Sequence, residues 1–345
     1  LWRRVQSRSL LGEEMIIKST ISFCPTCYKR IHADIFTDGK SVYMRKFCSE
    51  HGQTESVVER DVDFYYKVSG QRGIYNGYFI DVTERCNIQC KFCFRGPTNT
   101  KDPSIERLMQ EAVMAKGYGQ FIVTGGEPTL RDDLPQILEQ LNCVSPGNAL
   151  LTNGIRMDEK MLDAVIPHLR YWDGTVGLNL SIHPESNGAD RKLVELMRRK
   201  GLKLESILWV IDDLSQIPEV IEFAEENKDV IAAVRLKVAT KLWSEQKPDS
   251  KIFVSDILKY LKENDYNPEV AWWLNNRVTF FNVTIFGIHF MLVSWYDVNN
   301  IDILDYNCPP VYKSKIGLVE NLVTSCIVNE GISKGWVDGV QIKCL

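Results

Sequence analysis

The strongest constraint on the fold is a regular alternation of apolar and amphipathic segments through the middle of the chain. Apolar runs recur at GYFIDVT (77–83), QFIVTGG (120–126), ALLTNG (149–154), VGLNLSI (176–182), SILWVI (206–211) and VIAAVRLKV (230–238), each followed by a helix-like segment except the last. The runs are short and unalternating, which is typical of strands covered on both faces. Because helical crossovers between parallel strands are right-handed, the pattern predicts an α/β sheet, either a partial barrel or an open wound sheet.

Four distinctive segments lie at the ends of these strands. CNIQCKFCF (86–94) follows the first strand and GGEPTL (125–130) the second, while TNG (152–154) ends the third. Asn179 and Ser181 lie near the end of the fourth. Because chemistry gathers at the carboxyl ends of parallel strands, we expect all four segments to share one functional edge.

The first of these segments carries three cysteines, Cys86, Cys90 and Cys93, in the spacing C-x3-C-x2-C. A cubane iron–sulfur cluster normally takes four thiolates, so three would leave one iron free to bind a substrate or cofactor. A zinc site made from these three alone would lack its fourth ligand. Three buried structural thiols are the remaining alternative, which the polar, irregular character of the loop disfavours.

This cysteine spacing, with aromatic Phe92 before the third cysteine, resembles the signature of the radical S-adenosylmethionine (radical SAM) enzymes. The resemblance covers about residues 75–241, and TGGEPTL (124–130) is similar to the family's glycine-glycine-glutamate segment. It implies a partial (βα)6 TIM-like barrel that holds a [4Fe-4S] cluster on Cys86, Cys90 and Cys93 and binds S-adenosylmethionine (SAM).

The resemblance also implies which residues surround the cofactor. They are Phe92, Gly125, Gly126, Glu127, Thr152, Asn153, Asn179, Ser181 and Arg235. Phe92 would pack near the adenine, and Arg235 would pair with the methionine carboxylate. The segment 125–127 would receive the amino group, since glycines allow close approach to the main chain and a carboxylate matches an ammonium. For the residues outside this segment, a structural hydrogen bond or a solvated charge is the alternative.

A reaction type follows from the same resemblance. An electron from the cluster would cleave SAM to a 5′-deoxyadenosyl radical, which would abstract hydrogen from a substrate. No catalytic side chain is expected beyond the cluster ligands, and flavodoxin or ferredoxin is the expected electron donor. The substrate is expected to be a small molecule, apolar or lipid-like, with a peptide or cofactor precursor as the alternative. A non-enzymatic, structural zinc-binding protein is the alternative of another class.

An N-terminal group of ligands predicts a second metal site. Cys24 and Cys27 form one C-x2-C pair, and Cys48 and His51 form a C-x2-H pair. Together they supply a closed tetrahedral site, for which zinc is favoured and mononuclear iron is the rival. The residues between the pairs are expected to form two strands around Asp38–Gly39. A metal module ahead of this core resembles the archaeal group that includes the tetraether lipid synthase.

The C-terminal third is less informative. Cys308, Cys326 and Cys344 are single cysteines that suggest an auxiliary iron–sulfur cluster, with buried structural thiols as the commoner alternative. The uncharged stretch 278–295 is rich in β-branched and aromatic residues and is broken by Gly287. It predicts a hairpin near Phe286–Gly287 rather than a transmembrane helix.

The whole chain fits a cytoplasmic protein with several units. Its 345 residues carry a net charge of −4, which argues against a broad nucleic-acid-binding surface. Ten cysteines in close groups plus single residues favour a reducing compartment with thiolate metal ligands, and peripheral membrane contact stays open. We expect an added or disordered segment at 1–14, the metal module at 15–72, the radical SAM core at 73–245 and an α+β substrate-covering region at 246–345.

Overall fold

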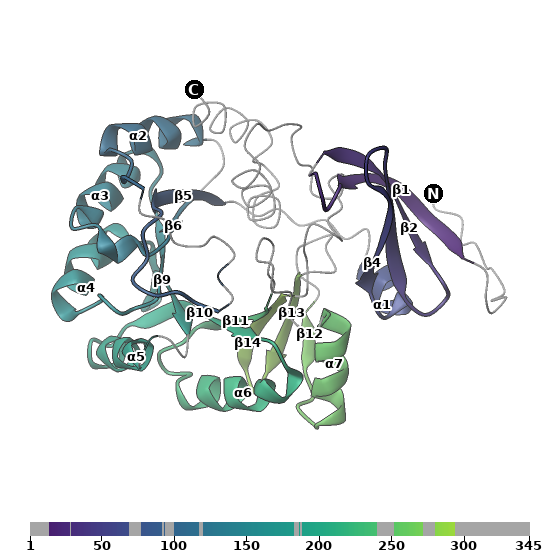
Figure 1. The fold of residues 1–345 in the computed structure, drawn as a ribbon. Coiled ribbons are helices and arrows are strands. Elements are labelled where there is room, and N and C mark those ends of the chain that lie inside the picture. The colour runs from purple at the N-terminus through teal and green to yellow at the C-terminus, as the bar shows by residue number, and fades with distance from the viewer. Residues whose placement is uncertain are drawn as a thin grey trace.

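The computed structural model describes residues 14–27, 29–68, 77–91, 93, 100–116, 120–182, 186, 188–239, 252–271 and 280–293. These residues form a four-stranded sheet near the N-terminus and a ten-stranded sheet that makes up the core, as Figure 1 shows. The expectations for residues 1–13, Phe92, Cys308, Cys326 and Cys344 lie outside the described residues.

The N-terminal sheet is an antiparallel meander. Its elements are β1 (Met15–Phe23), β2 (Arg30–Thr37), β3 (Val42–Cys48) and β4 (Gly52–Glu59), followed by helix α1 (Val62–Val68). The turn between β2 and β3 forms because Gly39 adopts a φ of 90° and the Asp38 carboxylate accepts two main-chain N–H bonds at 2.8 Å. The two strands expected around Asp38–Gly39 are therefore confirmed, within a larger sheet.

The core follows the predicted alternation. Its parallel strands are β5 (Gly77–Thr83), β6 (Gln120–Gly125), β7 (Ala149–Thr152), β9 (Thr175–Ile182), β10 (Lys203–Ile211) and β11 (Ala233–Val238), paired in that order. The helices between them are α2 (Ile105–Met114), α3 (Leu134–Val144), α4 (Glu159–Val165), α5 (Ala189–Arg199) and α6 (Ile217–Glu226). In Figure 1 the strands curve with these helices on the outside, so the fold is a partial barrel.

A short strand interrupts the simple alternation. β8 (Tyr171–Trp172) pairs antiparallel with the start of β9, through Tyr171 opposite Val176. It lies in the turn between α4 and β9, which contains Asp173 and Gly174 at positive φ. A two-residue strand leaves no periodic signal, so β8 could not be predicted from the sequence.

A hairpin extends the sheet beyond the sixth core strand. β13 (Phe280–Ile285) and β14 (Ile288–Val293) turn at Phe286–Gly287, as expected, and β12 (Glu269–Ala271) pairs with β13. β14 pairs parallel with β11, so this hairpin belongs to the core sheet rather than only covering it. Among the described residues, no helix has the length and apolar character needed to cross a membrane.

The two faces of the core strands differ. In β11 the side chains of Val234, Leu236 and Val238 are buried among the helices, while Arg235 and Lys237 are only partly buried. Because successive side chains of a strand point to opposite faces, Arg235 and Lys237 lie on the inner face of the barrel. The strand therefore alternates, unlike the doubly apolar strand that its sequence suggested.

The N-terminal module joins the core at helix α7 (Val254–Glu263). Arg60 donates to Asp256 at 2.9 Å, and its guanidinium lies 5.3 Å from the centre of the Phe253 ring. The Ser255 hydroxyl donates to the Glu59 carboxylate. These contacts place the end of β4 against the first turn of α7.

Candidate active site and metal centre

Two glycines bring the second strand against the approach to the cysteine loop. The Gly126 N–H donates to the Thr83 carbonyl at 2.7 Å, and the Glu127 N–H donates to the Arg85 carbonyl at 2.8 Å. A Cβ on Gly125 would lie 2.1 Å from the Thr83 oxygen, and one on Gly126 would lie 2.0 Å from the Arg85 oxygen. The glycines are thus required for backbone packing beside the thiols, a reason the sequence did not reveal.

The buried Glu127 side chain links the end of the second strand to the end of the third by hydrogen bonds. Its side chain is almost fully buried, and Oε1 accepts from the Thr129 N–H at 3.1 Å, the Thr129 hydroxyl at 2.5 Å and the Thr152 hydroxyl at 2.7 Å. Oε2 accepts from the Asn153 N–H at 2.7 Å. Burial raises the pKa of Glu127 above its usual range, against these hydrogen bonds. The carboxylate therefore fixes the TNG segment beside the glycine-glycine-glutamate turn.

Asn153 carries this connection to the cysteine loop. Its amide Nδ2 donates to Asn87 Oδ1 at 2.8 Å, and its Oδ1 accepts from the Ile155 N–H at 3.1 Å. Asn87 directly follows Cys86 in the loop. The sequence reasoning missed Asn87, although its position inside CNIQC was a signal that it lies at the site.

The three loop thiols are partly accessible. Cys86 and Cys90 are half-buried, Cys93 is exposed, and the Cys93 N–H donates to the Cys90 carbonyl at 3.1 Å. Burial, with smaller contributions from the charges of Glu127 and Cys93, raises the pKa of the Cys86 thiol. Lys91 forms an ion pair at 3.1 Å with Asp212, just after β10, so the loop is tied across the strand ends.

The cysteine loop carries the type of donor that iron–sulfur clusters take. Among the described residues, only the N-terminal Cys/His group brings its donor atoms close enough to share one metal ion. Thiolates are the ligands that iron–sulfur clusters take, and the cysteine loop offers three of them at the carboxyl edge of the sheet.

The expected fourth-strand residues lie in different surroundings. Asn179 is buried in the middle of β9, where it accepts from the Ser206 hydroxyl at 2.5 Å and donates to Glu205 at 3.1 Å. Arg170 also pairs with Glu205. Ser181 is half-buried and lies two residues further along β9. Arg235 lies on β11, two strands away in the sheet. The amide of Asn179 is therefore already engaged within the barrel wall.

The N-terminal ligands converge as a tetrahedral site. The Cys24 and Cys48 sulfurs lie 3.6 and 3.5 Å from His51 Nδ1, and the Cys27 and Cys48 sulfurs lie 3.9 Å apart. A tetrahedral zinc ion bound at about 2.3 Å from sulfur and about 2.05 Å from nitrogen would set these ligands about 3.8 and 3.5 Å apart. The residues present therefore fit zinc.

Main-chain groups prepare one of these thiols for the metal. Burial acts to raise the pKa of Cys24, but the N–H groups of Cys27 and Thr26, together with the Cys27 and Cys48 thiols, outweigh it and lower the pKa to about 6. Because the thiolate is the form that binds metal, this turn favours the ligand state at neutral pH.

Two family models match separate parts of the chain. Residues 16–60 match a model described as the HMPTM N-terminal zinc ribbon domain. Residues 80–223 match the radical SAM superfamily. The first match covers the Cys/His site, and the second begins within β5 and includes the three loop cysteines, the 125–127 segment and Asn179.

Curated relatives and solved structures give partial matches. The 7,8-dihydro-6-hydroxymethylpterin dimethyltransferase of Methanocaldococcus jannaschii is 24% identical over 300 residues, 71% of this chain and 58% of that protein. A probable GTP 3′,8-cyclase of Thermoplasma volcanium is 30% identical over 45% of this chain and 52% of that protein. Streptococcus suis SuiB aligns with a TM-score of 0.45 and 19% identity, over 56% of this chain and 46% of SuiB. The chain spans less than two thirds of each of these proteins.

Proposed function

We propose that this protein modifies a pterin-type cofactor precursor by hydrogen abstraction. The chain belongs to the radical SAM superfamily of enzymes and carries an N-terminal zinc ribbon. The observation that supports this substrate is that the zinc ribbon match and the relative matched over most of the chain agree. The ribbon model is named for the HMPTM group, and a relative covering 71% of the chain is named as a pterin dimethyltransferase. This supports the cofactor-precursor alternative over the tetraether lipid synthase group that the sequence suggested.

In this proposal Cys86, Cys90 and Cys93 hold a [4Fe-4S] cluster. When bound, the cluster supplies the electron that cleaves SAM and so starts hydrogen abstraction. The chain's own contribution is positioning. The contacts of Gly126 and Glu127 with the backbone of 83–85 set the loop beside the glycine turn, and the Asn87–Asn153 hydrogen bond fixes its first half.

The contacts divide the proposed cofactor residues into two groups. Glu127, Thr152 and Asn179 are buried and hydrogen-bonded within the protein, so we propose that they shape the site without needing to touch the ligand. The direct contacts would come from the main chain of Gly125, Gly126 and Asn153 and from the partly buried side chains of Ser181 and Arg235. Phe92 lies outside the described residues and keeps the adenine-packing role that the family resemblance implies. Arg235 would supply the cation for a carboxylate, since it lies on the inner face of the barrel.

For the N-terminal site we propose zinc on Cys24, Cys27, Cys48 and His51, with mononuclear iron as the alternative. We propose the units 15–72, 73–245 and 246–345, the last of which adds its hairpin to the core sheet. An electron donor of the flavodoxin or ferredoxin type would serve the cluster. An auxiliary cluster on Cys308, Cys326 and Cys344 would appear as iron in excess of one cubane per chain.

The test is anaerobic reconstitution followed by isotope tracing. We expect four iron ions per chain and SAM cleavage, both lost when the three loop cysteines are replaced by alanine. Deuterium at the non-exchangeable carbons of 7,8-dihydro-6-hydroxymethylpterin should then appear in 5′-deoxyadenosine. Transfer from a deuterated isoprenoid lipid or a peptide, with none from the pterin, would overturn the substrate proposal and leave the radical SAM chemistry standing.

A further inference from the structure

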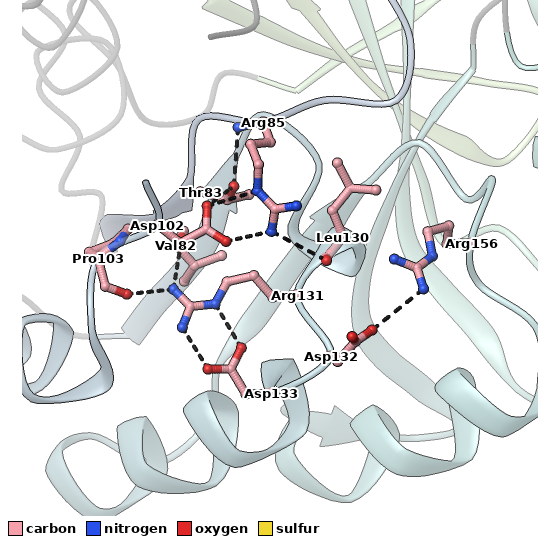
Figure 2. Close-up of polar contacts among 10 residues, drawn as sticks. All are labelled: Val82, Thr83, Arg85, Asp102, Pro103, Leu130, Arg131, Asp132, Asp133 and Arg156. Atoms are coloured by element: carbon pink, nitrogen blue, oxygen red, sulfur yellow. Dashed lines mark hydrogen bonds and ion pairs between the residues drawn. The ribbon is translucent and has the colours of Figure 1, made fainter. Parts of the chain in front are cut away.

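One polar cluster grips both ends of the cysteine loop, as Figure 2 shows. The chain leaves β5 at Thr83 and returns to the same cluster at Asp102, and all three thiols lie in between. We propose that Arg85, Asp102 and Arg131 are positioning residues that form a loop clamp, which holds the thiols ready for the iron–sulfur cluster. The identity of that cluster rests on the proposed function.

Asp102 is the centre of the loop clamp. Its Oδ1 accepts from the Thr83 hydroxyl at 2.6 Å and from Arg85 Nε at 3.1 Å, and its Oδ2 accepts from Arg85 Nη2 at 2.5 Å. The Thr83 hydroxyl in turn accepts from the Arg85 N–H at 3.1 Å. A two-point contact between a guanidinium and a carboxylate fixes both distance and orientation. The residue before Cys86 is therefore locked to the returning end of the loop.

Arg131 also joins the end of β5 to the returning end of the loop. Its Nη1 donates to the Val82 carbonyl at 2.9 Å and to the Pro103 carbonyl at 2.7 Å, joining the end of β5 to the end of the loop. Its other nitrogens bind both carboxylate oxygens of Asp133, at 2.8 and 2.6 Å. The Arg131 side chain is only 6% exposed, so its contacts with the two carbonyls are shielded from water. Figure 2 shows Arg131 between the start of α3 and the loop.

The loop clamp acts on the loop more than on the core sheet. β5 is already held by its parallel ladder with β6, which includes Ile80 opposite Val123. Arg85 and Asp102 lie outside that ladder, with side chains 40% and 20% exposed. The clamp instead closes the loop before the cluster binds. Cluster formation therefore does not have to overcome the entropy cost of loop closure. Opening it should therefore weaken cluster retention without unfolding the barrel.

The test variant is Asp102→Asn, which keeps the size of the side chain and removes its charge. Figure 2 also shows a matched control, the Arg156–Asp132 pair, which is 3.5 Å long and largely exposed. We expect the Asp102→Asn holoenzyme to lose iron to a chelator about tenfold faster than wild type, since charged hydrogen bonds of this kind are lost. Asp132→Asn should match wild type, and both variants should keep the wild-type melting temperature.

Two further measurements separate positioning from a general loss of structure. The Arg85→Asp/Asp102→Arg exchange should recover iron retention at least in part, because the pair is restored with reversed polarity. In metal-free protein, amide exchange across 84–93 should rise for Asp102→Asn and stay at the wild-type rate across β9 and β10. If Asp102→Asn does not fold, Arg85→Lys keeps the charge, loses the two-point contact and is scored in the same way.

The outcomes are distinct from those of the functional proposal. Wild-type protein that never holds a cubane cluster overturns the proposed function. Wild-type protein that holds one, with Asp102→Asn retaining iron and amide protection equally well, overturns the loop clamp. Equal losses for Asp102→Asn and Asp132→Asn would also overturn it, because the effect would then be one of net charge.

Discussion

We expect Glu59 to make the stability of this protein fall as pH rises from about 5 to about 8, and Glu59→Gln to remove that dependence. Glu59 is fully buried where the zinc ribbon meets α7. One oxygen accepts from the Arg60 N–H at 2.7 Å and from the Ser255 hydroxyl, while the other has no hydrogen-bond partner in the described part of the chain. Burial is the main cause that raises the pKa of Glu59 from 4.5 to about 8.

The sign follows from linkage. The folded protein holds the Glu59 proton more tightly than the unfolded chain, so the proton stabilises the fold below pH 4.5. That contribution is lost as pH rises through about 8. At about 1.4 kcal/mol per pKa unit, the wild type should lose on the order of 3 kcal/mol between pH 5.5 and 9 through this group. Glutamine mimics the protonated carboxyl and does not titrate.

The assay is thermal unfolding of zinc-loaded wild type and Glu59→Gln from pH 5.5 to 9. We expect similar melting temperatures at pH 5.5 and a variant that melts roughly 6 °C or more above wild type at pH 9. Groups other than Glu59 titrate in both proteins and cancel in the difference. Parallel pH profiles would show that the Glu59 carboxyl is not held neutral at this joint, which would refute the reasoning.

Three further changes test the site. Gly126→Ala should be destabilising by several kcal/mol or displace the cysteine loop, because its Cβ would lie 2.0 Å from the Arg85 oxygen; an unchanged melting curve and iron content would contradict this. Cys24→Ser should abolish the single tightly bound zinc measured by mass spectrometry of metal content, and retention of full zinc would remove Cys24 from the ligand set. Glu127→Gln should weaken SAM binding in calorimetry about tenfold or more, because in either orientation its NH2 group would face a main-chain N–H donor, of Thr129 or of Asn153; wild-type affinity would contradict this role of the carboxylate.

The parts of the fold predicted from sequence are those with local signals. The core strands other than β11 are short apolar runs, each followed by an amphipathic helix, so the sequence predicts a wound α/β sheet or partial barrel without knowledge of any contact. The zinc site was equally accessible, because its ligands come as two close pairs, Cys24 with Cys27 and Cys48 with His51. The turn at Phe286–Gly287 was marked by the glycine.

What the sequence could not provide are contacts between distant residues. The position of β14 beside β11 depends on burying Phe290 and Leu292, which a hairpin covering the barrel mouth could equally have done. The bonds of Arg131 to Val82 and Pro103 join residues 49 and 28 positions apart, and an arginine in a sequence carries no mark of its partner. The sequence likewise carried no sign of the partners of Asn179, which was expected near the ligand. The β-bulge after Leu204 brings Glu205 and Ser206 into hydrogen-bond contact with its amide.

The close backbone contact between the glycine turn and residues 83–85 has a consequence for how such a barrel can diversify. The start of the thiol loop, the turn after β6 and the TNG segment are joined by these contacts, and Gly125, Gly126 and Glu127 leave little room for change there. On the inner face of β11, the partly buried side chains of Arg235 and Lys237 lie outside this set of contacts with the glycine turn. We therefore expect changes in substrate preference, in a protein of this design, to arise by variation on β11 rather than at the glycine turn.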